Sequence, residues 1–315
     1  MCARNQIQPQ KRWPKTNYIL PLLAITLANA GPAGSYDFKQ EAKLQRARDL
    51  YSAGHFLEAR AIVGPMCNKP DSTAPMYCLL AETYIDDPEQ LTKDGPKIEN
   101  ALHSALKIDP NYSLTYKDLA EYYNCLGDYK RAIENSSIAL KLPHPYIYTL
   151  RQRAIAYSNS GQYDKALADI DKFISLEKPA EPTYIMKAGI LEKMKRYDDA
   201  VATYRKAFEL RHQDMTLYSI TRCFEMQHKY AEATTEVSRV IKMNPHDAEA
   251  LAVRGRLQSQ CKNYAEALKD FSKAIDIEPT VRLYKSRASA YQKLGQKQAA
   301  ERDLASAIKL DEGNF

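Results

Sequence analysis

The sequence lacks the short motifs that catalytic and nucleotide-binding sites use. It has no glycine-rich phosphate loop, no G-x-S-x-G turn and no H-E-x-x-H pair. Its six histidines fall mainly near turns and show no metal-ligand spacing. The acidic residues between 86 and 94 do not follow the spacing of an EF-hand loop. We therefore predict a protein that is not an enzyme and that holds no metal and no cofactor.

Glycine and proline are also scarce, at 11 and 16 of 315 residues, which argues against a disordered chain. Hydrophobic residues make up 44% and charged residues 27%, so the chain has the composition of a soluble globular protein with a core. Tyrosine is the exception, because 22 tyrosines stand against 7 phenylalanines. That excess calls for a structural explanation.

The first thirty residues contain no acid and four basic side chains: Arg4, Lys11, Arg12 and Lys15. An apolar run of eleven residues follows at 18–28, which is too short for a membrane-spanning helix of about 20 residues. Ala28 and Ala30 then place small residues where a signal peptidase cleaves. We predict a signal peptide at 1–30, cleavage after Ala30, a periplasmic or secreted protein and no stable membrane span after processing. The alternative is an uncleaved N-terminal membrane anchor.

Charge is nearly balanced outside this segment. The whole chain carries a formal charge of +6, but from Gly31 onward there are 41 basic side chains (45 less the four above) against 39 acidic ones. A near-neutral body has no overall field that would draw it to nucleic acid or to anionic lipid. The sequence therefore predicts no nucleic-acid partner.

Cysteine is too sparse for a disulfide framework. Cleavage after Ala30 would leave five cysteines, an odd number, of which only Cys67 and Cys78 lie close in sequence. A disulfide between Cys67 and Cys78 is one interpretation. The preferred one is that each cysteine is a small buried apolar side chain.

A repeat of about 34 residues runs through the chain. It is marked by a tyrosine after each short turn, with spacings of 34, 34, 33 and 34: Tyr129, Tyr163, Tyr197, Tyr230 and Tyr264. An alanine follows each of them three residues later: Ala132, Ala166, Ala200, Ala233 and Ala267. A glycine ends several first helices, and Pro110, Pro245 and Pro279 end three second helices. Small residues let two helices approach closely, and the aromatic ring fills the end of the hairpin, which accounts for the tyrosine excess.

At these positions the sequence resembles the tetratricopeptide repeat family over residues 40–315. The resemblance implies an all-α, right-handed superhelical solenoid of about eight two-helix repeats whose first helices line a concave groove. The units start near residues 40, 74, 113, 147, 181, 214, 248 and 281, after a short leader at 31–39. The second unit carries an insertion at 86–96, which we interpret as a tolerated surface loop, with a functional loop as the alternative.

The resemblance also predicts which side chains face the groove, near the second, fifth, ninth and twelfth places of each unit. They are Lys117, Glu121, Asn124, Tyr148, Arg151, Tyr218, Arg222, Glu225, Glu249, Arg256, Arg282 and Lys285. The C-terminal end of this list contains four basic side chains, Arg222, Arg256, Arg282 and Lys285, which suit an acidic segment or a free C-terminal carboxylate. A solvated face with no ligand is the alternative. Family members that serve chaperones hold a carboxylate with Lys and Asn, but Glu121 stands where the Asn would be, so we do not predict a chaperone-tail receptor.

These observations predict a protein–protein interaction scaffold that binds a protein or peptide in its groove and is a monomer without its partner. The alternative is a structural or assembly protein that self-associates through its repeat ends. Glu301 stands where internal repeats have apolar side chains, and Ile308 is expected to be partly exposed, which leaves room for self-association.

Overall fold

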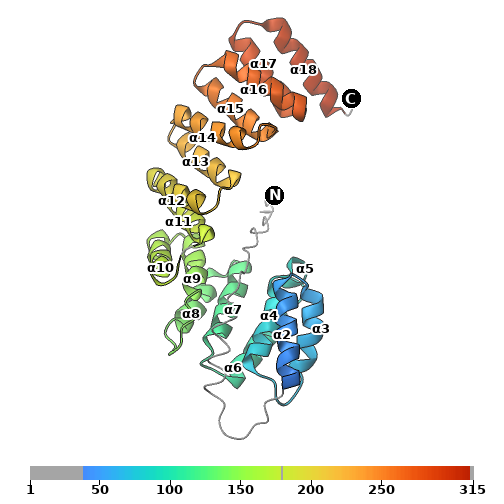
Figure 1. Ribbon diagram of the computed structural model, residues 1–315, viewed down its shortest axis with the longest axis vertical. Helices are drawn as coiled ribbons and strands as arrows, with labels where there is room; N and C mark the ends of the chain where they lie inside the picture. Colours follow the sequence, from blue (N-terminus) through green and yellow to red (C-terminus); the bar gives the residue numbers. More distant parts are fainter. Residues whose placement is uncertain (1–37, 179, 313–315) are drawn as a thin grey trace. The chain divides into compact units, whose positions relative to one another are not determined.

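The computed structural model describes residues 38–178 and 180–312, and these residues form seventeen helices and no strand (Figure 1). The predicted all-α repeat fold is thereby confirmed. The predicted signal peptide at 1–30 lies outside the described residues. The chain divides between Glu177 and Lys178 into two compact units, which are described separately.

The N-terminal unit consists of four helical hairpins. Their helices are α2 (Phe38–Ser52), α3 (Phe56–Cys67), α4 (Ala74–Ile85), the short α5 (Pro88–Leu91), α6 (Gly95–Ile108), α7 (Ser113–Cys125), α8 (Tyr129–Ala139), α9 (Thr149–Asn159) and α10 (Tyr163–Leu176). The first and second helix of each hairpin pack together, and each hairpin also packs on the next.

The C-terminal unit consists of four further hairpins. Their helices are α11 (Glu181–Lys193), α12 (Tyr197–Leu210), α13 (Asp214–Met226), α14 (Tyr230–Met243), α15 (Ala248–Gln260), α16 (Tyr264–Ile277), α17 (Val281–Lys293) and α18 (Lys297–Asp311). In the two units together, six first helices begin at the residues where the sequence period places a unit start: α4, α7, α11, α13, α15 and α17.

The turn inside each regular hairpin has a left-handed residue two positions before the second helix. Glycine fills this place four times, at Gly54, Gly127, Gly161 and Gly295, with φ between 75° and 84°. Lysine or histidine fills it three times, at Lys195, His228 and Lys262, with φ between 58° and 62°. A backbone bond spans each turn, such as that from Asn263 N to Gln258 O at 2.8 Å. The hairpin therefore imposes this conformation even where a side chain makes it costly.

Small residues set the closeness of the paired helices. The alanines three places after each turn aromatic are fully buried in five repeats: Ala132, Ala166, Ala200, Ala233 and Ala267. In the α15–α16 hairpin a glycine replaces the usual alanine of the first helix, because a Cβ on Gly255 would stand 2.8 Å from the ring of Phe271. The repeat residues read from the sequence thus form the core.

The insertion of the second repeat folds onto the first repeat. It contains α5, which begins with the side chain of Asp87 accepting a hydrogen bond from Glu89 N. The Arg60 guanidinium of α3 lies 3.4 Å from the Asp87 carboxylate and 3.8 Å from the centre of the Tyr84 ring. These contacts favour a structural role for the segment.

Cys67 and Cys78 are unbridged and buried in the structure. Cys67 packs with the core of the first repeat, whereas Cys78 packs with the core of the second and third repeats. Cys223 is buried as well, but Cys125 is exposed and Cys261 is half-buried, so the preferred interpretation of five buried cysteines fits three of them. In the part of the chain that the structure describes, no helix is both long and apolar enough to cross a membrane.

Candidate partner-binding surface

In the N-terminal unit, Lys117 is buried and not open to a partner. Its side chain is 8% exposed, and its Nζ lies 3.0 Å from Glu82, 2.5 Å from Asp118 and 3.1 Å from Glu121. Glu82 belongs to α4 and the other three residues to α7, so this group, the Lys117 cluster, joins two repeats. We predicted that Lys117 faces an open groove, and its burial shows that this prediction is wrong. Glu121, also predicted to face the groove, serves the same cluster.

The charged groups of the Lys117 cluster shift one another's pKa values. Burial disfavours the ammonium of Lys117, but the nearby carboxylates of Asp118, Glu121 and Glu82 outweigh it and raise its pKa. Burial raises the pKa of Asp118; the ammonium of Lys117 acts to lower this pKa, and the carboxylate of Glu82 acts to raise it further. Three carboxylates therefore share one ammonium at low exposure, which suits a structural joint.

The other predicted residues of the N-terminal unit contact neighbouring helices. Asn124 donates from Nδ2 to the carbonyl oxygen of Gln152 at 2.9 Å and so links α7 to α9. The ring of Tyr148 meets the ring of Phe173 edge-on, with centroids 5.1 Å apart. The Arg151 guanidinium lies 5.8 Å from the centre of the same Phe173 ring. Asn124 thus joins two repeats, whereas Tyr148 and Arg151 pack within the hairpin of α9 and α10.

The C-terminal unit arranges its predicted residues differently. Three arginines on successive first helices each reach back to a glutamate on the first helix of the preceding repeat: Arg222 on Glu192, Arg256 on Glu225 and Arg282 on Glu249. Arg222 donates from Nε at 3.0 Å and from Nη2 at 2.8 Å, and Arg256 donates from Nη1 at 2.5 Å. We call these three pairs the arginine ladder.

The arginines of the ladder are more exposed than their glutamates. Their side chains are 60%, 53% and 68% exposed in chain order, against 14%, 19% and 56% for the glutamates. Lys285 is exposed on the same helix as Arg282. Four basic and three acidic side chains leave an excess of one positive charge on this face, so it is less basic than the sequence suggested. Tyr218 donates its hydroxyl to Asp247 at 2.9 Å.

Sequence reasoning missed a second set of arginines, which join the repeats. Arg153, Arg254 and Arg287 each donate two hydrogen bonds of 2.7–2.8 Å to an aspartate sixteen residues later: Asp169, Asp270 and Asp303. Each also donates from Nη1 to a serine of the preceding second helix at 3.0–3.3 Å: Ser137, Ser238 and Ser272. The recurring Arg and Asp sixteen residues apart were the signal for these pairs. The aspartates are at most 6% exposed, so these arginine–aspartate forks are structural.

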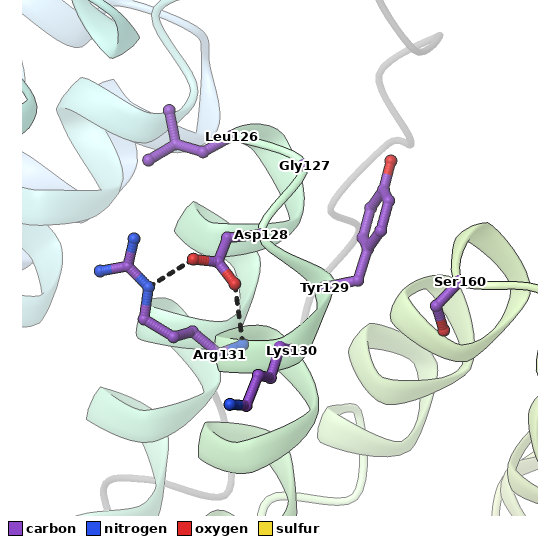
Figure 2. Close-up of a pocket in the computed structure, with 7 residues that line it drawn as sticks. All are labelled: Leu126, Gly127, Asp128, Tyr129, Lys130, Arg131 and Ser160. Carbon is purple, nitrogen blue, oxygen red and sulfur yellow. Dashed lines mark hydrogen bonds and ion pairs between the residues drawn. The ribbon is translucent and has the colours of Figure 1, made fainter.

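Two depressions lie among the described residues. An open depression of about 630 Å³ lies at the turn between α7 and α8. Figure 2 shows side chains that line it, among which Asp128 accepts hydrogen bonds from the backbone nitrogen and the Nε of Arg131. A smaller depression of about 200 Å³ lies beside Glu249 and Arg282. In the ranges 38–178 and 180–312, no three His, Cys, Asp or Glu side chains are grouped as metal ligands.

Tetratricopeptide repeat models match the chain at residues 181–214 and 281–314, and another such model matches residues 226–281. The chain is 32% identical over 79 residues to tetratricopeptide repeat protein 13 of Homo sapiens, which is 25% of this chain and 9% of that protein. It is 41% identical over 54 residues to Hsp70-Hsp90 organizing protein 1 of Glycine max, which is 17% of this chain and 9% of that protein. The matches thus span less than a tenth of these curated relatives.

A solved structure shows the same fold. The C-terminal part of a TPR repeat-containing protein from Cytophaga hutchinsonii superposes with a TM-score of 0.55 at 19% identity, over 62% of this chain and 80% of that one. At this identity the likeness concerns the fold alone. The matched repeat models, the curated relatives and the observed hairpins together identify the chain as a tetratricopeptide repeat protein.

Proposed function

We propose that the chain is a non-enzymatic protein–protein interaction scaffold that binds a peptide or protein partner along its first helices. The observation that carries the proposal is the arginine ladder, in which three exposed guanidinium groups stand on the successive first helices α13, α15 and α17. Arg222 and Arg256 hold the ninth place of their repeats and Arg282 holds the second. Rigid stacked helices would present these groups without being ordered by binding, so little entropy would be lost. A tetratricopeptide repeat fold supports this class of function.

We also propose that the scaffold acts outside the cytoplasm. The support is the basic stretch, the short apolar run and the Ala28-Asn29-Ala30 site in the first thirty residues. Secretion of a reporter fused after Gly31, compared with the same fusion carrying Arg or Lys in place of Leu22 and Leu23, tests the location. Retention of both fusions in the cytoplasm would contradict it.

The binding experiment uses the full chain as bait in an extracytoplasmic extract. The matched variants both remove four positive charges. One changes Arg222, Arg256, Arg282 and Lys285 to Ala, and the other changes Lys206, Lys242, Lys273 and Lys309, exposed residues of the second helices, to Ala. The proposal expects a partner that the unchanged chain and the second variant retain and the first loses. Equal retention by the two variants would place the site elsewhere.

Self-association is the alternative function, and one observation favours it. On α18 the side chains of Leu304 and Ile308 are 37% and 57% exposed, whereas Phe271 and Ile275, which hold the same places one repeat earlier, are 2% and 8% exposed. An apolar stripe of this kind could join two chains. Sedimentation velocity over a range of concentrations distinguishes the functions, because the scaffold is expected to stay monomeric and the assembly protein is not.

A further inference from the structure

The arginine ladder carries almost no net charge. Each arginine is already paired with a glutamate, so the pairs are neutral and only Lys285 adds net charge to this face. A face of this kind has little long-range attraction for an acidic partner. If it binds one, the binding must come from the placement of individual guanidinium groups.

The pairing leaves donors on each guanidinium. A guanidinium has five N–H groups, and the glutamate engages Nε and Nη2 of Arg222 but only one terminal nitrogen of Arg256 and one of Arg282. At least one terminal nitrogen of each arginine is therefore not directed at its glutamate. Because the arginines are more than half exposed, these nitrogens are accessible from solvent.

The glutamates also restrict the arginines. An exposed arginine has a long flexible side chain that loses conformational entropy when it binds a ligand. In the ladder the side chains lose this entropy when the chain folds, before any ligand binds, because each guanidinium is held by a carboxylate of the neighbouring repeat. Glu192 is itself held, since the buried Tyr204 of α12 donates its hydroxyl to Glu192 Oε2 at 2.6 Å. Tyr204, Glu192 and Arg222 thus form a chain that runs from the core to the surface.

We propose that Glu192, Glu225 and Glu249 are positioning residues that hold Arg222, Arg256 and Arg282 ready to bind the carboxylates of an extended acidic segment of a partner protein. The inference rests on the proposed scaffold function and adds the partner's chemistry. The segment supplies carboxylates to the guanidinium groups of three successive first helices, and each carboxylate accepts hydrogen bonds from the guanidinium nitrogens that the glutamate leaves available. Tyr204 acts one step further back, through Glu192.

The proposal differs from simple charge attraction in a measurable way. Changing Glu192, Glu225 and Glu249 to Gln makes the face more basic by three charges, so charge attraction alone expects tighter binding of an acidic peptide. Positioning expects weaker binding, because three arginines lose their anchors. Tyr204→Phe separates the two effects further, since it loosens Glu192 without any change of charge.

The test uses the full chain and a fluorescent peptide of alternating glutamate and alanine, with alternating glutamine and alanine as the neutral probe. Fluorescence anisotropy at about 0.15 M salt, where the Debye length is about 8 Å, limits long-range attraction. The unchanged chain is expected to bind the glutamate peptide in preference to the glutamine peptide. The variant with Arg222, Arg256 and Arg282 changed to Ala should lose that preference.

The Gln variant is expected to bind at least about tenfold more weakly, since each of the three freed side chains costs roughly two- to tenfold in affinity. Tyr204→Phe is expected to bind about twofold more weakly, mainly through faster dissociation. Equal or tighter binding by the Gln variant would overturn the positioning role. If the unchanged chain does not prefer the glutamate peptide, the proposal of an acidic partner is wrong. The proposed scaffold function still holds in that case if a protein partner is captured and its capture depends on the ladder. Circular dichroism and thermal unfolding of each variant show that the fold is kept.

Discussion

The two units use charge on their first helices in opposite ways. In the N-terminal unit one lysine lies buried among three carboxylates, whereas in the C-terminal unit three arginines lie exposed with one glutamate each. Burial makes the Lys117 cluster a joint that must stay paired, because unpaired charges cost much at low exposure. The exposed pairs of the ladder contribute little to stability, and their arginines remain accessible to solvent. Charged side chains of the first helices therefore hold repeats together in one unit and are exposed to solvent in the other.

The turns differ between the units as well. The regular turns of the N-terminal unit carry glycine at the left-handed position, at Gly54, Gly127 and Gly161. Three of the four turns of the C-terminal unit carry Lys or His there. A side chain in this conformation costs about 1–2 kcal/mol relative to the right-handed region. The C-terminal unit thus carries backbone strain that glycine would relieve.

The largest expected effect is on the Lys117 cluster. Lys117→Met leaves Glu82, Asp118 and Glu121 without their ammonium, and the loss of one partner of a buried ion pair costs about 3–5 kcal/mol. Hydrogen exchange of the α4 and α7 amides in the full chain measures the loss locally. Lys117→Met with Asp118→Asn, which removes one of the stranded carboxylates, should recover part of the stability. A loss below about 1 kcal/mol for the single variant, the range of exposed pairs, would contradict the buried joint.

A comparison within one helix should give the next largest effect. Arg254 and Arg256 both lie on α15, but Arg254 binds the buried Asp270 and Arg256 binds Glu225 at the surface. Arg254→Ala is expected to destabilise the chain by about 2–3 kcal/mol, because it leaves a buried carboxylate without donors. Arg256→Ala should cost less than about 1 kcal/mol. Urea unfolding followed by circular dichroism measures both losses of stability. Equal losses would contradict the distinction between arginines that hold repeats together and arginines that lie at the surface.

The pH dependence of stability tests the Lys117 cluster in another way. The folded state raises the pKa of Asp118, so it binds that proton more tightly than the unfolded chain does. This contribution to stability is complete below the unfolded pKa of about 3.9 and is lost as the pH rises through the folded pKa. Asp118→Asn should therefore show a smaller decrease in stability than the unchanged chain as the pH rises above about 4. Parallel pH profiles of the two proteins, measured by urea unfolding, would contradict the raised pKa.

The smallest expected effect concerns the turns. Lys262→Gly should stabilise the C-terminal unit by about 0.5–1 kcal/mol, the relief of left-handed strain less the added entropy of glycine in the unfolded chain. Gly161→Lys at the matching turn of the N-terminal unit should destabilise the chain by a similar amount. Thermal unfolding of both variants measures the changes, and shifts of the same sign would contradict the comparison.

The sequence predicted the repeat and its core because these rest on local spacing. Tyrosines and alanines at intervals of 34 residues specify paired helices, and a helix start such as Ser113 or Glu181 follows from counting. The left-handed Lys195 and Lys262 were not predicted, since no side chain marks a conformation that the surrounding hairpin imposes.

The binding surface was predicted only in part, because spacing gives a side chain's direction but not its partner. Arg222 and Lys117 hold neighbouring places in their repeats, yet Arg222 is 60% and Lys117 8% exposed. The adjacent repeat brings one carboxylate to each of them, and what separates them is that α7 itself adds Asp118 and Glu121 beside Lys117. Glu82 and Glu192 hold the ninth and twelfth places of their units, but spacing alone does not show that each contacts a basic side chain thirty or more residues away.

The most direct test of the central claim is hydrogen exchange of the full chain with and without a captured partner. The account predicts new protection on the first helices α13, α15 and α17 of the C-terminal unit, and none on α12, α14 or α16. The protection should disappear in the variant with Arg222, Arg256, Arg282 and Lys285 changed to Ala. Protection confined to the second helices, or to α4 and α7 around the Lys117 cluster, would show that the arginine ladder is not the binding surface.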